Sequence, residues 1–139
     1  MALNPAPRAL LDTSVVIDPP SNLPQYATTL AISTVTLAEL AYGLHVPDQV
    51  LAAARQVRYA RLAELYEDIP YSASAARVYG ALCASVRDAG RSPRPRRMDL
   101  LIASVAVDER TPLLTRNPAD FTGLHPAAQI IEIAPHGCG

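Results

Sequence analysis

The sequence contains no lysine, so twelve arginines and three histidines are its only basic side chains. Any catalytic scheme that requires a lysine is therefore excluded. Cysteine is scarce as well: Cys83 falls inside a helical pattern and Cys138 in a Gly-Cys-Gly tail. The two cysteines match neither the spacing of metal ligands nor a disulfide framework, so we expect a reduced, intracellular chain.

The chain also lacks a charged leader and any long apolar run. Its first seven residues carry no charged side chain, whereas a secretory leader begins with a positive region. The longest apolar runs fall far short of the ~18 residues expected of a membrane span. The sequence therefore predicts a cytoplasmic protein without a membrane segment.

A large excess of charge of either sign is absent too. Twelve basic and thirteen acidic side chains leave a net charge of −1, so bulk charge does not indicate nucleic-acid binding and any basic surface must be local. Half of the 139 residues are apolar, which is typical of a globular protein. We expect a single domain over residues 1–139, with a frayed tail at about 135–139.

Short apolar runs alternate with helical patterns along the chain. Strands are expected at 9–11, 30–35, 112–115 and 130–133, with a short edge strand at 69–71. Helices are expected at 13–17, from Thr36 to near Gly43, from Pro47 to about Glu67, from Ser72 or Ser74 to Gly90, and from Met98 to about Glu109. Such alternation predicts an α/β fold with a parallel sheet covered on both faces.

The long helix beginning near Pro47 has a mixed pattern. Its apolar side chains are expected to face mostly inward, and they are Val50, Ala54, Val57, Leu62 and Leu65.

Acidic or amide side chains occur at the predicted junctions between strands and the helices that follow them. They are Asp12, Glu39, Asp99, Asn117 and Asp120. Because the carboxyl ends of parallel strands meet in one crevice, these side chains are expected to converge. Clustered carboxylates repel one another unless a cation joins them, and Mg²⁺ and Mn²⁺ are the hard ions that take oxygen ligands.

Each carboxylate also has a purely structural interpretation. Asp12 could cap the following helix, and Glu39 could close a capping box with Thr36. Asp99 falls in a first helical turn, where the helix dipole favours an anion, and Asp120 could be a turn residue. The conjunction of all four at one predicted end of the sheet favours a shared site.

Four segments in order resemble the motifs of one known family. They are Leu10-Leu11-Asp12-Thr13-Ser14, Thr36-Leu37-Ala38-Glu39-Leu40 with Gly43, Met98-Asp99-Leu100-Leu101-Ile102-Ala103, and Leu114-Thr115-Arg116-Asn117-Pro118-Ala119-Asp120-Phe121. Together they resemble the PIN-domain ribonucleases, specifically the VapC toxins of bacterial VapBC type II toxin–antitoxin pairs. The resemblance covers nearly the whole chain.

This resemblance implies a fold, an activity and partners. The fold is a PIN-like three-layer α/β/α sandwich around a parallel sheet. The activity is a Mg²⁺- or Mn²⁺-dependent endoribonuclease that inhibits translation and growth, and the partners are a VapB-like antitoxin and a second copy in a homodimer. The alternative is a PIN module that binds RNA or antitoxin without cutting.

The resemblance also assigns site residues. Asp12 and Asp99 are direct metal ligands, and Glu39 is a ligand or a base that orients water. Asn117 stands where many members carry Asp. It can bind the metal through its amide oxygen but supplies no negative charge, and Asp120, the nearest carboxylate, is the alternative that completes the site, directly or through water.

Hydroxyl side chains flank these acidic positions. Thr13, Ser14 and Thr115 are expected to orient the carboxylates, with a plain capping or core role as the alternative.

Five arginines are candidates for contact with RNA phosphates. Four of them, Arg91, Arg94, Arg96 and Arg97, fall in a proline-containing segment that is expected to be an exposed loop, and the fifth is Arg116. The alternative is a solvated loop. The histidines at 45, 125 and 136 are not spaced as a metal set and receive no catalytic role.

A phosphoryl-transfer protein of the receiver or haloacid-dehalogenase type also carries an Asp after its first strand. Ser14 stands where such a protein needs a second Asp, and the characteristic lysine is missing. These two departures argue against that class.

Overall fold

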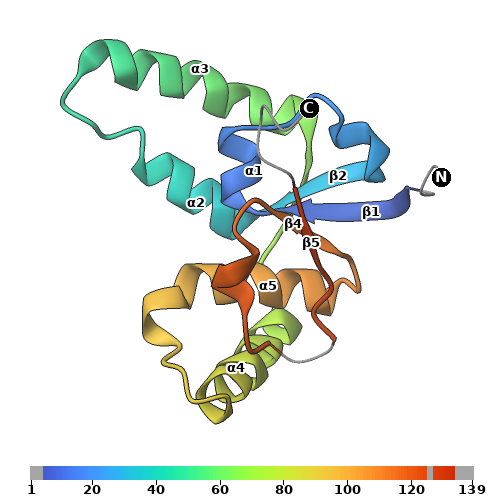
Figure 1. Cartoon of the computed structure of the whole chain (residues 1–139). Coiled ribbons are helices and arrows are strands. Elements are labelled where there is room, and N and C mark those ends of the chain that lie inside the picture. The colour runs from blue at the N-terminus through green and yellow to red at the C-terminus, as the bar shows by residue number, and fades with distance from the viewer. Residues whose placement is uncertain (1–4, 125–126, 134–139) are drawn as a thin grey trace.

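One five-stranded parallel sheet forms the centre of the computed structural model, which describes residues 5–124 and 127–133 (Figure 1). The strands stand in the order β3-β2-β1-β4-β5, and each neighbouring pair is parallel. Their bounds are β1 Ala6–Leu11, β2 Ala27–Ser33, β3 Glu67–Ile69, β4 Leu113–Thr115 and β5 Ile130–Glu132. The predicted α/β class is confirmed, while His125, His136, Cys138 and the predicted frayed tail lie outside the described residues.

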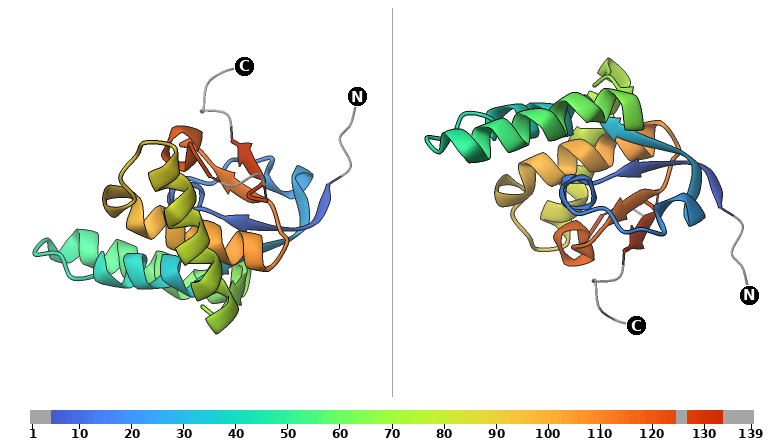
Figure 2. Two further views of the ribbon diagram at one scale, coloured as in Figure 1. Left: turned by 90° about the horizontal axis from the view of Figure 1, so that it is seen from below. Right: turned by 90° about the horizontal axis from the view of Figure 1, so that it is seen from above.

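Helices cover both faces of this sheet. The α-helices are α1 Thr13–Ile17, α2 Thr34–Tyr42, α3 Gln49–Leu65, α4 Ala73–Asp88 and α5 Arg97–Asp108. Short 3-10 turns are η1 Leu23–Gln25, η2 Arg94–Arg96 and η3 Pro118–Phe121. Figures 1 and 2 place α4 and α5 on one side of the sheet and α1 and α3 on the other, which gives the predicted three layers.

The central strand β1 supplies side chains to two separate cores. Leu10 packs in the core beneath α4 and α5 with Leu82 and Leu100, while Leu11 packs on the opposite face with Val15. The alternation follows from the strand geometry, because successive side chains point to opposite faces. A strand buried on both faces is apolar throughout, so Asp12 is tolerated only where β1 ends.

The start of α2 differs from the prediction. The helix begins at Thr34, because Ser33 is its N-cap and the Ser33 Oγ accepts a hydrogen bond from the Thr36 N–H at 3.2 Å. This N–H is therefore already bound to Ser33, and the capping box between Thr36 and Glu39 is wrong. The sequence pattern placed the start at Thr36, but the two hydroxyl residues before it, Ser33 and Thr34, could each be the cap as well. Local rules alone therefore do not fix where the helix begins.

The inward orientation predicted for α3 is wrong in most positions. Leu62 is buried, but Val50, Val57 and Leu65 are 82%, 57% and 62% exposed, and Ala54 is exposed as well. The pair of helices α2 and α3 projects beyond the sheet in Figures 1 and 2. Much of α3 therefore has no sheet beneath it.

Two smaller segments also differ in detail. The edge strand β3 runs over Glu67–Ile69, two residues before its predicted place. The arginine segment is a 3-10 turn over Arg94–Arg96 followed directly by α5, rather than an open loop up to Arg97. Within residues 5–124 and 127–133, none of the helices has the length and apolarity needed to cross a membrane.

The Ser33 cap generates a stability prediction. Ser33 is fully buried and its hydroxyl satisfies the Thr36 N–H, so Ser33→Ala removes the cap and leaves a buried donor without a partner. We expect the free energy of unfolding, measured by urea titration, to fall by about 1–2 kcal/mol. The matched control is Ser92→Ala at an exposed position outside the helices and strands, which should change the free energy of unfolding by less than about 0.5 kcal/mol. Equal stability of the two variants would contradict the assignment of the cap.

Candidate active site

Asp12 follows β1 and is held by two neutral donors. The Ser14 Oγ and the Thr115 Oγ1 both donate to its Oδ2, at 2.9 and 2.8 Å. Those hydroxyls are fixed in turn, because the Arg116 N–H donates to Ser14 and the Asn117 N–H donates to Thr115. The carboxylate is thus oriented by the ends of β1 and β4 together.

The side chain of Asp12 does not cap α1. Asp12 occupies the N-cap position, but its carboxylate makes no hydrogen bond to the helix N–H groups. Among the described residues every fully buried side-chain oxygen or nitrogen has a partner, and Oδ1 receives no hydrogen bond from them. Oδ1 is therefore not completely buried.

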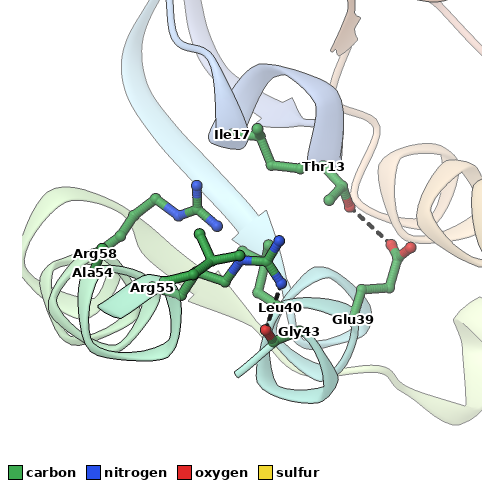
Figure 3. A pocket seen from close by; sticks show the side chains of 9 residues that line it. Thr13, Ile17, Glu39, Leu40, Gly43, Ala54, Arg55 and Arg58 are labelled. Atoms are coloured by element: carbon green, nitrogen blue, oxygen red, sulfur yellow. Dashed lines mark hydrogen bonds between the residues drawn. The ribbon is translucent and has the colours of Figure 1, made fainter. Parts of the chain in front are cut away.

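Glu39 points from α2 toward the first residue of α1. The Thr13 Oγ1 donates to Glu39 Oε1 at 2.8 Å and lies 3.1 Å from the Thr36 Oγ1 (Figure 3). Thr36 is fully buried and contacts Ser33 below it. A chain of hydroxyls thus connects Ser33, the cap of α2, through Thr36 and Thr13 to the Glu39 carboxylate. Sequence patterns did not indicate the part that Ser33 plays in it.

The pKa of Asp99 depends on its burial and on the charges of the other carboxylates. It lies in the first turn of α5 and is half-buried, and burial is the main reason that its pKa is raised to about 6. The next causes are the negative charges of Asp12, Asp120 and Glu39, while Arg96 acts in the opposite direction on this pKa. Four carboxylates from separate parts of the chain therefore lie within electrostatic reach of one another.

The structure separates the two candidates that follow β4. Asn117 is exposed and carries no charge. Asp120 is partly buried in η3, and its negative charge is among those that raise the pKa of Asp99. Arg96 holds η3 in place, because its Nη1 donates to the main-chain carbonyls of Ala119 and Asp120 at 3.2 and 3.1 Å.

The carboxylates do not form a ready-made chelate. Over residues 5–124 and 127–133, no three His, Cys, Asp or Glu side chains are placed so that together they could hold a metal ion. The four carboxylates therefore interact electrostatically, but they do not form a complete set of metal ligands.

The arginines predicted to contact RNA are placed in two different ways. Arg94 and Arg97 are exposed and line a pocket of about 320 Å³ together with Asp99, which we name the Asp99 pocket. Arg91 is exposed as well. Arg116 instead donates its Nε and Nη2 to the Asp18 carbonyl at 2.9 and 2.6 Å, and its side chain is only 13% exposed. It braces the end of α1, so the structure does not favour its predicted contact with RNA.

Two further arginines reach the site from α3. Arg55 and Arg58 line a second pocket, of about 440 Å³, whose other side holds Thr13 and Glu39; we name it the Glu39 pocket (Figure 3). The Arg55 Nη1 donates to the Gly43 carbonyl at 2.6 Å. Their spacing of three residues places both arginines on one helix face, but sequence patterns do not reveal that α3 folds back toward α1.

The sequence has a family match and close relatives. The sequence profile of the PIN domain matches residues 9–122. Ribonuclease VapC5 of Mycobacterium tuberculosis is 34% identical over 142 aligned positions, which cover 94% of this chain and 96% of that protein.

Solved structures agree with this match. The VapBC-5 toxin–antitoxin structure from Mycobacterium tuberculosis superposes with a TM-score of 0.77 at 31% identity, over 93% of this chain and 99% of that one. VapBC2 from Rickettsia felis, bound to a DNA fragment from its promoter, gives a TM-score of 0.77 at 28% identity over 91% and 99%. The profile spans most of the residues that carry the sheet and all four carboxylates, and the chain therefore belongs to the PIN-domain family.

Proposed function

We propose that this chain is a metal-dependent endoribonuclease and the toxin of a toxin–antitoxin pair. The observation that carries the proposal is the placement of Asp12, Glu39 and Asp120 near Asp99, where their negative charges add to the effect of burial in raising the pKa of Asp99. Its similarity over nearly its whole length to a protein named ribonuclease VapC5 supports the reaction. RNA hydrolysis that inhibits translation and growth, in the cytoplasm, is the expected consequence.

The donor set fits a hard divalent cation. Four carboxylates offer only oxygen atoms, and Arg96 is the one cation that acts against the raised pKa of Asp99, so the cluster retains excess negative charge. Mg²⁺ suits a site without a closed set of protein ligands, because it keeps several waters and takes one or two carboxylates plus phosphate oxygens. We assign Asp12 and Asp99 as its ligands, with Glu39 and Asp120 as ligands through oxygen or through water.

The division of labour follows from these placements. A bound Mg²⁺ or Mn²⁺ would supply an activated water and stabilise charge on the phosphate oxygens. Asp12 presents one oxygen to the site because Ser14 and Thr115 hold the other. Glu39, held by Thr13, orients the attacking water, and Asp120 replaces the charge that Asn117 lacks.

The exposed arginines of the Asp99 pocket are the proposed entry for RNA. The side chains of Arg94 and Arg97 make no hydrogen bond or ion pair within the part of the chain that the structure describes, so their guanidinium groups are available. The planar guanidinium matches phosphate with two parallel hydrogen bonds. Arg96 contributes indirectly, since its side chain supports η3.

An apolar surface on one side of the molecule suits a protein partner. Six of the seven large apolar side chains that are exposed in residues 5–124 and 127–133 belong to α1, α2 and α3. Exposed apolar patches of this kind mark protein contacts. The solved relatives are toxin–antitoxin complexes, so we propose that a VapB-like antitoxin binds this chain. We also propose a homodimer, which sedimentation of the purified protein would test.

Metal binding is testable without activity. The Asp99 carboxyl binds its proton more tightly in the folded state, with a pKa of about 6 against 3.8, so the metal-free protein loses stability as pH rises from about 4 to 6. Asp99→Asn removes this penalty. At about pH 7.5 and without metal, the variant should be more stable than wild type by on the order of 1 kcal/mol, after allowance for solvent screening.

The difference in stability between wild type and Asp99→Asn should change when metal is added. Mn²⁺ should raise the melting temperature of wild type and not that of Asp99→Asn, because a ligand that binds only the folded state stabilises it. Asp68→Asn, at an exposed position of β3, is the matched control and should behave as wild type. Equal stabilisation of wild type and Asp99→Asn by Mn²⁺ would contradict the role of Asp99.

The role of Glu39 is tested by cleavage. Because Ser33 caps α2, Glu39 has no part in starting the helix, and Gln can still accept the hydrogen bond from Thr13. Glu39→Gln should therefore keep its melting temperature and lose roughly 100-fold or more of its RNA cleavage rate in Mg²⁺. Glu64→Gln, exposed on α3, is the control. A folded Glu39→Gln protein that cuts RNA at the wild-type rate would refute the assignment, and a wild type that binds RNA but never cuts it would favour the non-cutting module.

The arginines of the Asp99 pocket are tested by salt dependence. Replacing Arg94 and Arg97 with Ala removes two exposed charges that stabilise no other group, so the melting temperature should change little. The slope of log affinity against log salt for single-stranded RNA should become shallower by up to ~0.7 for each lost phosphate contact. The matched control is the pair Arg61→Ala and Arg77→Ala at exposed positions of α3 and α4. An unchanged slope in the first pair would leave these arginines as solvated surface.

A further inference from the structure

The Glu39 pocket adjoins the acidic site but is a separate hollow. Thr13 and Glu39 form the wall that it shares with the carboxylate cluster, and Arg55 and Arg58 form the wall opposite (Figure 3). Its volume of about 440 Å³ falls in the range of pockets that hold small molecules. A group bound there would lie directly beside Glu39.

The two arginines of this pocket differ in the hydrogen bonds that their side chains make. Arg55 is held by the Gly43 carbonyl, which fixes its guanidinium near the end of α2. The Arg58 side chain makes no hydrogen bond or ion pair within residues 5–124 and 127–133, although Arg58 is partly buried. A partly buried guanidinium without a protein acceptor is suited to an anion, and its fork of donors matches phosphate.

The other residues that line the pocket indicate which chemical group would be attached to such an anion. Ile17, Leu51 and Ala54 give apolar surface from α1 and α3, which suits the face of a ribose or a base. No aromatic ring and no Asn or Gln amide is among the side chains that line the pocket. Aromatic rings and amides are common groups for stacking on a base or reading its edges, so the lining supports contact with the phosphate of a nucleotide better than selection of its base.

The basic groups also lie on two sides of the acidic cluster. Arg55 and Arg58 adjoin it next to Glu39, while Arg94 and Arg97 adjoin it next to Asp99. In Figure 1, α3 and the segment that precedes α5 lie on different sides of the sheet. RNA carries one phosphate at each nucleotide, so a strand that crosses four carboxylates needs positive charge both before and after them.

We propose that the Glu39 pocket is a binding subsite for the nucleotide next to the scissile phosphate, in which Arg58 holds the flanking phosphate and the apolar wall receives the sugar and base. The proposal rests on the ribonuclease function proposed above and adds the path of the strand: Arg94 and Arg97 bind it on one side of the carboxylates, and Arg58 on the other. A segment of a protein partner is the competing occupant, because the apolar wall continues toward Val57 and Leu65.

The test uses RNA binding in the absence of cleavage. In the Asp99→Asn background, Arg58→Gln should weaken binding of a fluorescent single-stranded RNA by roughly tenfold, measured by anisotropy, with a salt slope shallower by ~0.7. Arg61→Gln, three residues further along the same helix and outside the pocket, should leave both unchanged. Arg58→Lys should restore the salt slope and only part of the affinity, because it retains the charge without the fork of donors.

The outcomes distinguish this subsite from the function on which it rests. If Asp99→Asn does not bind RNA and wild type does not cut it, the ribonuclease function fails. If wild type cuts RNA but Arg58→Gln binds as tightly as Arg61→Gln, the subsite is refuted and the pocket belongs to a protein partner. Replacing the RNA with homopolymers of different base should change the loss at Arg58→Gln by less than about threefold, and a loss confined to one base would overturn the phosphate-based contact.

Discussion

The parallel pairing of β1 with β2 and β4 is the constraint on which the site depends. Because these strands run in the same direction, their carboxyl ends lie at one edge of the sheet. This arrangement brings Asp12, Ser33 and Thr115 to the same edge. Each of the three is almost wholly buried, so their side chains must find partners in one another and in nearby hydroxyls. An antiparallel β4 would place Thr115 at the opposite edge, and Asp12 would lose a donor.

The site is built with neutral donors, and this choice preserves its charge. Hydroxyls from Thr13, Ser14 and Thr115 orient the Asp12 and Glu39 carboxylates. Arg55 and Arg96 instead direct their hydrogen bonds to main-chain carbonyls. Arginines paired directly with the carboxylates would cancel the negative field that a divalent cation requires. The fold thus keeps positive side chains at the margin, where they brace turns or remain available for phosphate.

The helices α2 and α3 connect this chemistry to the outer surface. They project beyond the sheet (Figures 1 and 2), and the apolar residues on α3 that a sheet would otherwise cover are exposed. The same projection places Arg58 beside Glu39. One structural feature therefore offers a surface for a protein partner and a wall for the substrate path, so a partner that covers α3 is positioned to compete with RNA at the Glu39 pocket.

The sequence alone determined the fold class, because apolar runs such as 9–11 and 113–114 alternate with helical patterns. It made Asp12 a candidate because a buried strand tolerates a charge only at its end, and it made Glu39, Asp99 and Asp120 candidates because each stands near a predicted junction between elements. It could not decide between cap and site for Glu39, since Ser33, Thr34 and Thr36 are all plausible caps by local rules. Only the tertiary structure excluded the capping box, because the Thr36 N–H is bound to Ser33, and it placed Thr13 against Glu39. The effect of the Asp120 charge on Asp99, the hydrogen bonds of Arg116 to Asp18 and the position of Arg58 likewise depend on distances between elements far apart in the chain. Periodicity and spacing do not encode these distances.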